Sequence, residues 1–390
     1  MTSTTVASPT RTRLVVALGV LVLLGSMVVA VAVGAGDRDF LDLGIYRDAV
    51  STWWHGDSPY GVAFTDGLQF NYPPSSLVLL VPLDLLPQTL TGVLLVLLGA
   101  VLLWSSGRWS LPGAPITGIA LTTGLLSMSE PVQMTWRYGQ VDLLVVAAVT
   151  AALVRPVGRG AAPLLGAAAG LKLLPVTFLL VPALQHRLRT VGLALATTGL
   201  LVALALVRAP SMLGDYLDQL VHGAVLIRPA DEGHNVSWRG LLGWAVGDHA
   251  TAAWFLVVLA LGAVGLVTLV RAVRLGDRLS AVCVVALLGL LLSPVTWTHH
   301  WVWVVLLLGT AIPWWRSDRR IDRAHLIAVL ALTAAMVLWL PTWFTDVDHS
   351  YRTDGLRWLC AYSYVLLGTV VLVTLALRVR TDAVAARSGP

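Results

Sequence analysis

Apolar runs long enough to cross a lipid bilayer recur along the whole chain. A transmembrane helix needs roughly 17 to 25 mostly apolar residues, and stretches of that length separate nearly all the polar segments. Charged residues make up only 12% of the sequence, about half the ~25% share that is typical of soluble domains. The pattern therefore predicts an all-α polytopic membrane protein. It excludes a soluble fold, which would have to hide every run in one core.

The arginine clusters orient the chain, because cytoplasmic loops hold the excess of positive charge. We therefore place the arginine-rich segments around 187, 274, 320 and 380 inside the cell, together with the N-terminus. Single spans connect these anchors at about 190–207, 250–273, 279–292, 299–315, 325–341 and 358–378. The first apolar run is longer than a signal-peptide core and is expected to be retained as a helix. We predict one membrane domain over 1–390, with a cytoplasmic N-terminus at 1–13, a cytoplasmic tail at 379–390, a long first extracytoplasmic loop at 37–74 and a second one at 208–249.

The middle of the chain is less regular. Pro82 and Pro87 interrupt the run at 75–104, which forms either one broken helix or two short ones. Counting it as one span satisfies the charge rule better. The run at 161–185 then becomes a broken pair, with Lys172 near its outer turn. The total is about 10 to 12 transmembrane helices.

The outer segments carry most of the polar chemistry. They include "DRDFLDLGIYRDAV", "SEPVQMTWRYGQVDLL", "HNVSWRGLL" and "SPVTWTHHWVW". Aromatic faces suit the C–H surfaces of sugars, while carboxylates and amides bind hydroxyl groups. A lipid-linked-sugar flippase is an alternative of another class, but transporters tend to hold polar groups at the bilayer midplane. Polar groups collected at one face favour an enzyme.

Asp42 is the first candidate catalytic residue. It follows the first apolar run, in the segment "FLDLGIY". Partial desolvation by such neighbours raises the basicity of a carboxylate, which suits a general base. The alternative is a solvated acid that caps the following helix. From spacing alone, the capping interpretation leads.

Lys172 is the only lysine in the chain, which has 26 lysine and arginine residues in total. An ammonium group in an apolar segment needs an anionic partner, and a lipid-linked phosphate would serve. The alternative is a side chain that extends to the nearest interface. Arg137 and Arg239 are further candidates for binding phosphate, and each is also explained as an interfacial arginine.

His299 and His300 stand at the outer end of a predicted span. Neighbouring helical residues point about 100° apart, so one of the two is expected to face a common site, to bind phosphate or to orient Asp42. The alternative is an interfacial position within a tryptophan belt. No HxxxH or HxxE pattern is present, and Cys283 and Cys360 lie in apolar runs. We therefore expect no metal and no other cofactor.

The chain has only two asparagines, Asn71 and Asn235, and both lie in polar interruptions. We hypothesise that they belong to one site, where Asn235, Trp238 and Arg239 bind sugar hydroxyls and Asn71 joins from the first loop. Two other interpretations stay open for Asn235: an Asn-X-Ser glycan acceptor, and a turn that caps a short helix.

Six segments occur in an order that resembles a known family. They are "DLGIYRDA" (42–49), "FNYPPSSLVLLVPLDLLP" (70–87), "GQVDLL" (139–144), "GLKLLP" (170–175), "NVSWRGLL" (235–242) and "SPVTWTHHW" (293–301). Together they resemble the GT-C polyprenyl-phosphate-mannose-dependent mannosyltransferases of actinobacteria, glycosyltransferase family 87, over about residues 37 to 303. One position departs from the family: Asp142 stands where an asparagine is common.

The resemblance implies a cell-membrane enzyme that moves a sugar from a polyprenyl phosphate to a lipid-anchored acceptor outside the cytoplasm. It makes Asp42 the base of a single inverting displacement that forms an α-linked product. It also implies that Lys172 and one of the two histidines stabilise the leaving phosphate. Tyr72 and Gln140 are further expected contacts of the donor, and Tyr46 is an expected contact of the sugar or acceptor.

The substrates that the resemblance implies are mannose and a phosphatidylinositol mannoside, with lipomannan or lipoarabinomannan as the second choice of acceptor. Arabinofuranose from decaprenyl-phosphate arabinose is an alternative donor sugar within the family. The expected partners are the lipid donor, the glycolipid acceptor and the bilayer. No nucleic acid is expected, and the oligomeric state is left open.

Overall fold

The computed structural model describes residues 9–36, 40–155, 158–222, 235–344 and 356–387. Within these ranges the chain is helical and has no named β-strand; one isolated bridge joins Ala63 and Gln69. The helices are α1 (Pro9–Gly34), α2 (Leu41–Trp54), α3 (Pro74–Leu80), α4 (Gln88–Ser110), α5 (Ile116–Ser127), α6 (Glu130–Arg137), α7 (Asp142–Val149), α8 (Ala161–Leu171), α9 (Leu180–Leu184), α10 (Leu188–Leu206), α11 (Met212–His222), α13 (Trp238–Val246), α14 (Ala250–Leu275), α15 (Arg278–Leu292), α16 (Val304–Ala311), α17 (Arg320–Val337), α18 (Trp358–Ala361) and α19 (Ser363–Arg387).

Five helical stretches are long and apolar enough to cross a membrane. A sixth is obtained if α6 and the helix after it, which are bent by 119° to each other, count as one span. The five are α1, α4, α10, α13 with α14, and α19. Other apolar segments form shorter helices, including α3, α5, α8 and α15. The all-α polytopic class is thus confirmed, with fewer full-length spans than the 10 to 12 helices predicted.

Two interruptions in the middle of the chain shape the site. Residues 75–104 do not form one helix: α3 continues into a short 3-10 helix, η2 (Val81–Asp84), and α4 begins after Pro87. The segment 161–185 forms the predicted broken pair, in which α8 ends at Leu171 and the chain continues through η5 (Leu174–Leu179) into α9. Lys172 is the C-cap of α8, at the turn between the two halves.

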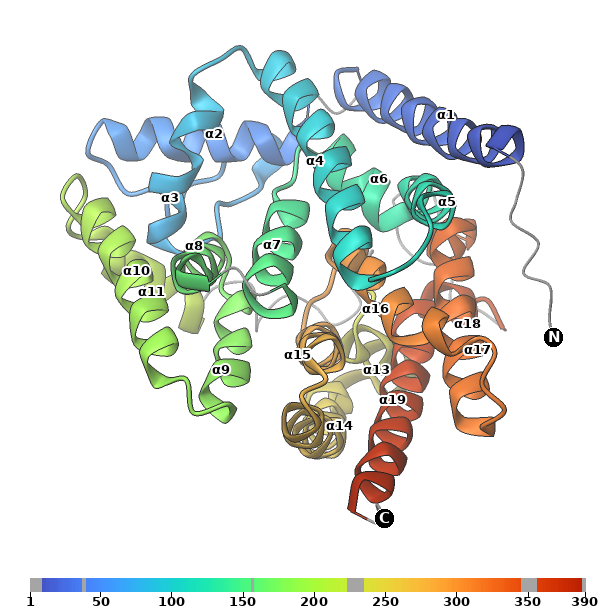
Figure 1. Ribbon diagram of the computed structural model, residues 1–390. Coiled ribbons are helices and arrows are strands. Elements are labelled where there is room, and N and C mark those ends of the chain that lie inside the picture. The colour runs from blue at the N-terminus through green and yellow to red at the C-terminus, as the bar shows by residue number, and fades with distance from the viewer. Residues whose placement is uncertain (1–8, 37–39, 156–157, 223–234, 345–355, 388–390) are drawn as a thin grey trace.

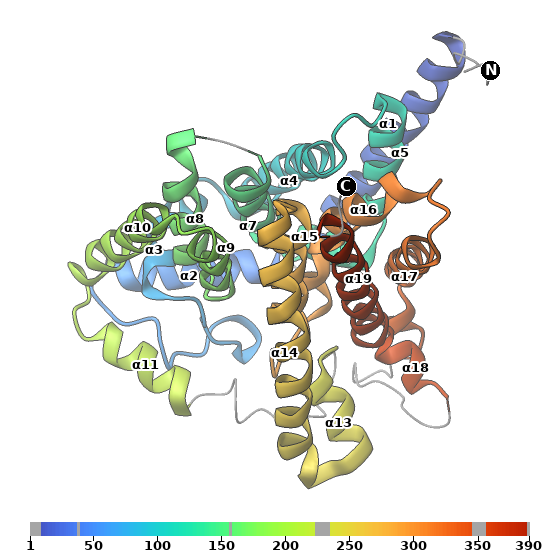
Figure 2. The ribbon, with the colours of Figure 1, turned by 60° about the horizontal axis from the view of Figure 1, so that its bottom comes forward.

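Helices α14 and α19 run from the lower to the upper half of Figure 2. In Figure 2, α1 begins and α19 ends in the upper half, while α11, α13 and α18 lie at the bottom. Helices α14 and α15 are antiparallel neighbours joined by a turn at Gly276, so the start of α14 and the end of α15 lie at the same end. Figure 1 shows α2 next to α3 and α4, and α8 beside α3 and α7.

Helix α2 is a short amphipathic helix whose apolar side is buried. Tyr46, Ala49, Val50 and Trp53 recur at helical spacing and are all buried. The Trp53 indole donates to the Ala205 carbonyl at the end of α10, over 2.8 Å. This packing fixes the direction of α2 and therefore the position of the residues in its first turn.

Arg47 ties the opposite side of α2 to η2. Its guanidinium donates to the carbonyls of Leu83, over 2.7 Å, and Leu86, over 2.5 Å. It also pairs with the Asp84 carboxylate at 3.3 Å. Pro87 has no N–H group, so the Leu83 carbonyl four residues before it lacks a helical donor, and Arg47 satisfies this carbonyl.

Phe40 anchors the start of α2 in a slot between α1 and α4. The residue is fully buried and has a left-handed backbone, with φ of 50°. Glycines form both walls: a Cβ atom added at Gly34 or Gly92 would lie within 2.6 Å of the ring. The absence of side chains at these positions lets the ring enter, and the ring sets the depth of α2.

We expect Gly92→Ala to destabilise the folded protein by about 1 to 3 kcal/mol, because its methyl group overlaps the Phe40 ring in a packed core. Thermal unfolding of the protein in detergent would measure the loss. Gly25→Ala in α1 is the matched control, because nothing lies within 4 Å of its added Cβ. Equal unfolding temperatures for the two variants would contradict the slot.

Candidate active site

The site begins where the C-terminal end of α6 contacts the start of α2. Helix α6 closes with a Schellman motif: Gly139 N–H bonds to the Trp136 carbonyl and Gln140 N–H to the Thr135 carbonyl. Gly139 has a φ of +69°, a conformation that suits glycine. A Cβ there would also lie 2.7 Å from the Leu43 Cβ atom. The "GQ" motif is therefore a helix cap that brings Gln140 against α2.

The N-terminus of α2 docks on this cap. The free backbone N–H groups of Asp42 and Leu43 both donate to the Tyr138 carbonyl, at 3.0 and 3.1 Å. Orphan donors at a helix start and an orphan acceptor at a helix end thus satisfy each other. The result places the Asp42 and Gln140 side chains in contact.

Gln140 joins one carboxylate to three donors. Its Nε2 donates to Asp42 Oδ2 over 2.6 Å. Its Oε1 accepts from the hydroxyls of Tyr46, at 2.6 Å, and Tyr72, at 2.9 Å, and from Lys172 Nζ, at 3.3 Å. The two hydroxyls lie 2.7 Å apart. The charges on both sides fix the orientation of the amide, because the opposite orientation would turn its NH₂ group towards the ammonium.

The environment of Asp42 raises its pKa to about 6 from an ordinary value of 3.8. Burial is the largest cause, because removal from water disfavours the charged carboxylate. The hydrogen bond from Gln140 and the charge of Lys172 act in the opposite direction. A carboxylate with this pKa is ionised at neutral pH and more basic than a solvated aspartate, as a general base requires.

Asp142 is the anionic partner of Lys172. Its Oδ1 accepts from Lys172 Nζ over 2.5 Å, and both side chains are mostly buried, with exposed fractions of 13% for the lysine and 8% for the aspartate. The Lys172 ammonium also lies 5.0 Å from the centre of the Tyr72 ring. Asp142 therefore supplies the counter-charge that the lone lysine needs.

The structure separates the two histidines. His299 is buried and faces the site: its Nε2 lies 3.5 Å from Gln140 Nε2, and its ring meets the Tyr138 ring edge-on. His300 Nδ1 instead accepts from the Trp297 backbone N–H of the same turn, over 3.4 Å. The expectation that one of the pair faces a common site agrees with this arrangement, and that residue is His299.

Asn235 ties down the loop that carries His299. Its Nδ2 donates to the Pro294 carbonyl at 3.1 Å and its Oδ1 accepts from Thr296 N–H at 3.0 Å. It is 2% exposed, so these backbone bonds occupy a buried amide. Ser237 caps α13 and also donates to Pro294. The pattern is that of a turn that caps a short helix, one of the interpretations that the sequence left open.

Other predicted residues lie apart from Gln140. Asn71 is exposed, and no interaction described for it joins it to Asn235. The Trp238 indole donates to the Thr369 hydroxyl of α19 at 3.0 Å, and Arg239 is buried. The Arg137 guanidinium lies 4.8 Å from the centre of the Trp339 ring. Their expected roles in binding sugar and phosphate stay predictions, as does the absence of a metal.

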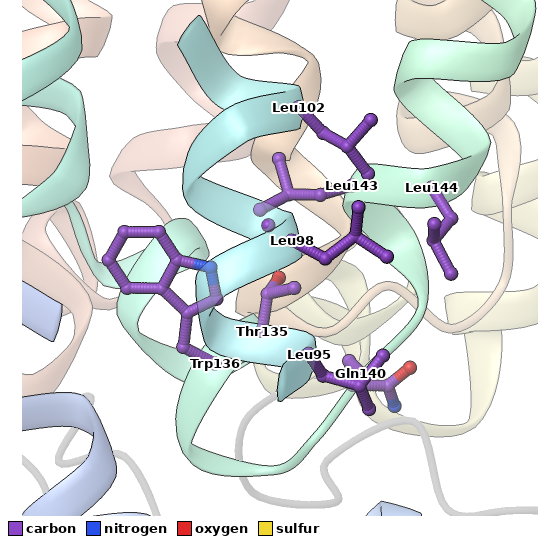
Figure 3. Close-up of a pocket in the computed structure, with 9 residues that line it drawn as sticks. Leu95, Leu98, Leu102, Thr135, Trp136, Gln140, Leu143 and Leu144 are labelled. Atoms are coloured by element: carbon purple, nitrogen blue, oxygen red, sulfur yellow. The ribbon is translucent and has the colours of Figure 1, made fainter. Parts of the chain in front are cut away.

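A small hollow lies behind Gln140, between α4, α6 and α7. Its volume is about 10 Å³, room for a single water molecule and too little for a sugar. Figure 3 shows Gln140 and Leu95 at its lower end, with Leu98, Leu102 and Leu143 above them. Gln140 thus has apolar packing behind it and polar partners in front.

Two contributors were missed from the sequence. Gly139 has a recognisable signal, a glycine that follows a helical segment ending in Arg-Tyr. Asp142 was noticed only as a departure, because its pairing with Lys172 spans 30 residues and two separate helices.

We expect Lys172→Met to destabilise the protein by about 3 kcal/mol or more, because it leaves the Asp142 carboxylate buried without a counter-charge. The double variant Asp142→Asn with Lys172→Met should recover most of that loss, since no net charge stays buried. Thermal unfolding in lipid nanodiscs measures both. A double variant as unstable as the single one would contradict the assignment of the pair.

Comparison with known proteins finds similar mannosyltransferases. A polyprenol-phosphate-mannose-dependent α-(1-2)-phosphatidylinositol pentamannoside mannosyltransferase of Mycobacterium tuberculosis is 30% identical, over 86% of this chain and 80% of its own length. A relative from Mycolicibacterium smegmatis is 31% identical, over 86% of this chain and 83% of its own length. It is named as a polyprenol-phosphate-mannose-dependent α-(1-2)-phosphatidylinositol mannoside mannosyltransferase. No solved structure matches the chain.

The sequence profile of glycosyltransferase family 87 matches residues 70–294, a range that includes Tyr72, Gln140, Asp142 and Lys172. Helices of transmembrane length agree with a membrane glycosyltransferase of the GT-C type. The chain belongs to glycosyltransferase family 87.

Proposed function

We propose that this enzyme transfers mannose from a polyprenyl-phosphate-mannose donor to a phosphatidylinositol mannoside, forming an α-(1-2) linkage, with Asp42 as the general base. The names of the relatives support the donor, the acceptor class and the linkage. They support neither the arabinofuranosyltransferase nor the flippase alternative. The observation that carries the catalytic assignment is the 2.6 Å contact between Asp42 Oδ2 and Gln140 Nε2 beside the Lys172 ammonium.

In the proposed reaction, the acceptor hydroxyl gives its proton to the Asp42 carboxylate while its oxygen attacks the anomeric carbon of mannose. The bond between that carbon and the phosphate oxygen breaks, and polyprenyl phosphate leaves with the electron pair. A single displacement inverts a β-linked donor to an α-linked product. Gln140 holds Oδ2, which leaves Oδ1 of Asp42 to meet the hydroxyl.

The charges around Gln140 suit a leaving phosphate. Lys172 supplies a cation beside the Tyr46 and Tyr72 hydroxyls, and His299 adds an imidazole from the facing loop. Positive charge and donors stabilise the negative charge that develops on the leaving group. Asp142 already balances Lys172, so we infer that the donor phosphate shares the ammonium with this carboxylate and does not meet an unpaired cation.

We place the reaction on the extracytoplasmic side of the cell membrane. The arginine-rich turns at 186–189 and 271–278 support this orientation, because they favour the cytoplasm. Asp42 follows the end of α1, and Lys172 lies at the turn between α8 and η5. Lipomannan or lipoarabinomannan is the second choice of acceptor.

We expect Asp42→Asn to lower the transfer rate by a factor of roughly 100 or more, because an amide cannot accept the proton. The assay uses purified protein in lipid, polyprenyl-phosphate-[³H]mannose and a phosphatidylinositol mannoside. Asp48→Asn is the matched control, an exposed aspartate of the same helix. Full activity in the Asp42 variant would exclude Asp42 as base, and loss in both variants would indicate a folding defect.

The rate should also depend on pH, because only ionised Asp42 accepts a proton. With a pKa of about 6, the carboxylate is ionised above this value, so the rate is level at higher pH and falls roughly tenfold between the plateau and pH 5. Initial rates at substrate concentrations well below KM, from pH 5 to 8, report kcat/KM and therefore the free enzyme, and they test this. A profile that stays level to pH 5 would contradict the raised pKa.

A further inference from the structure

A cavity lies between α14 and α19, at the end of α14 opposite to the loop that Asn235 holds. Its volume is about 630 Å³, within the range of sites that hold small ligands. Figure 2 shows the upper ends of the two helices side by side. Neither Gln140 nor any of the side chains that bond to it lines this cavity.

Three arginines line this cavity from two helices: Arg271 and Arg274 from the last turns of α14, and Arg380 from α19. Among the residues that the structure describes, no carboxylate pairs with them. The two acids nearest in sequence are engaged elsewhere, since Asp382 pairs with Arg319 and Asp277 caps α15. The site therefore has positive charge that the described chain does not neutralise.

The remaining walls are apolar, and several of their side chains are exposed. Leu266 and Val267 are 52% and 49% exposed, and Val270 lies one helical turn closer to Arg271. The exposed face of α14 continues away from the arginines through Leu259 and Leu256, both 69% exposed. The surface thus pairs a cationic end with an apolar track, as an anionic headgroup with an acyl chain requires.

We propose that this cavity binds an anionic phospholipid, with the headgroup phosphate at Arg271, Arg274 and Arg380 and an acyl chain along the apolar face of α14. A free phosphate would use the arginines alone and leave the apolar track without a function. Arginine suits the phosphate, because its planar guanidinium donates in pairs to phosphate oxygens.

The test is a titration of the detergent-purified full-length protein by native mass spectrometry, with phosphatidylglycerol, phosphatidylcholine and inorganic phosphate as separate probes. We expect phosphatidylglycerol to bind at least ~10-fold more tightly than phosphatidylcholine, and inorganic phosphate not to displace it. Equal binding of the two lipids would overturn the proposal. So would displacement by inorganic phosphate, which would indicate a free-anion site.

Matched variants locate the binding. The triple variant R271Q/R274Q/R380Q should lose the preference for phosphatidylglycerol. The control R187Q/R189Q/R320Q removes the same charge from exposed arginines outside the cavity and should keep it. If both triple variants lose the preference for phosphatidylglycerol equally, general surface charge explains the binding and the proposed site is overturned. If R271Q/R274Q/R380Q keeps the preference, the site is overturned as well. R271K/R274K/R380K keeps the charge, so binding by that variant would show that loss in the glutamine variant is not a folding failure.

Discussion

The side-chain amide of Gln140 holds the candidate site together. One end donates to Asp42 and the other accepts from two tyrosines and a lysine, so four residues from three separate segments of the chain share a single group. An amide suits this role because it is neutral and has both a donor and an acceptor end. A carboxylate at the same position would repel Asp42, and an apolar side chain would leave the buried polar groups without partners.

The fold provides what this amide needs. The Schellman cap of α6 directs Gln140 towards α2, and the Tyr138 carbonyl receives the first N–H groups of that helix. Phe40, seated between the glycines of α1 and α4, sets how deeply α2 lies. These contacts are backbone hydrogen bonds or close packing, which hold a geometry more precisely than long exposed side chains do.

Two charged regions differ in how the chain neutralises them. In the site, Asp142 balances Lys172 within a short, mostly buried pair, so charge stays in the apolar interior at an acceptable cost. Between α14 and α19, three arginines line a cavity whose other walls are apolar. A buried cation must be paired within the fold, whereas a cation at the membrane surface can take its partner from the lipid.

The sequence by itself determined the membrane class and the broken pair around Lys172, because hydropathy, proline positions and a single lysine are local or countable features. Spacing did not single out Asp42; the family resemblance did, and its role as base stays a proposal. It did not determine that Asp142 pairs with Lys172, that His299 and not His300 faces Gln140, or that Asn235 holds a loop. Those outcomes depend on which turns meet after folding. Residues as far apart as Asp42, Gln140 and His299 become neighbours only when helix ends dock on one another, and no spacing along the chain encodes that contact.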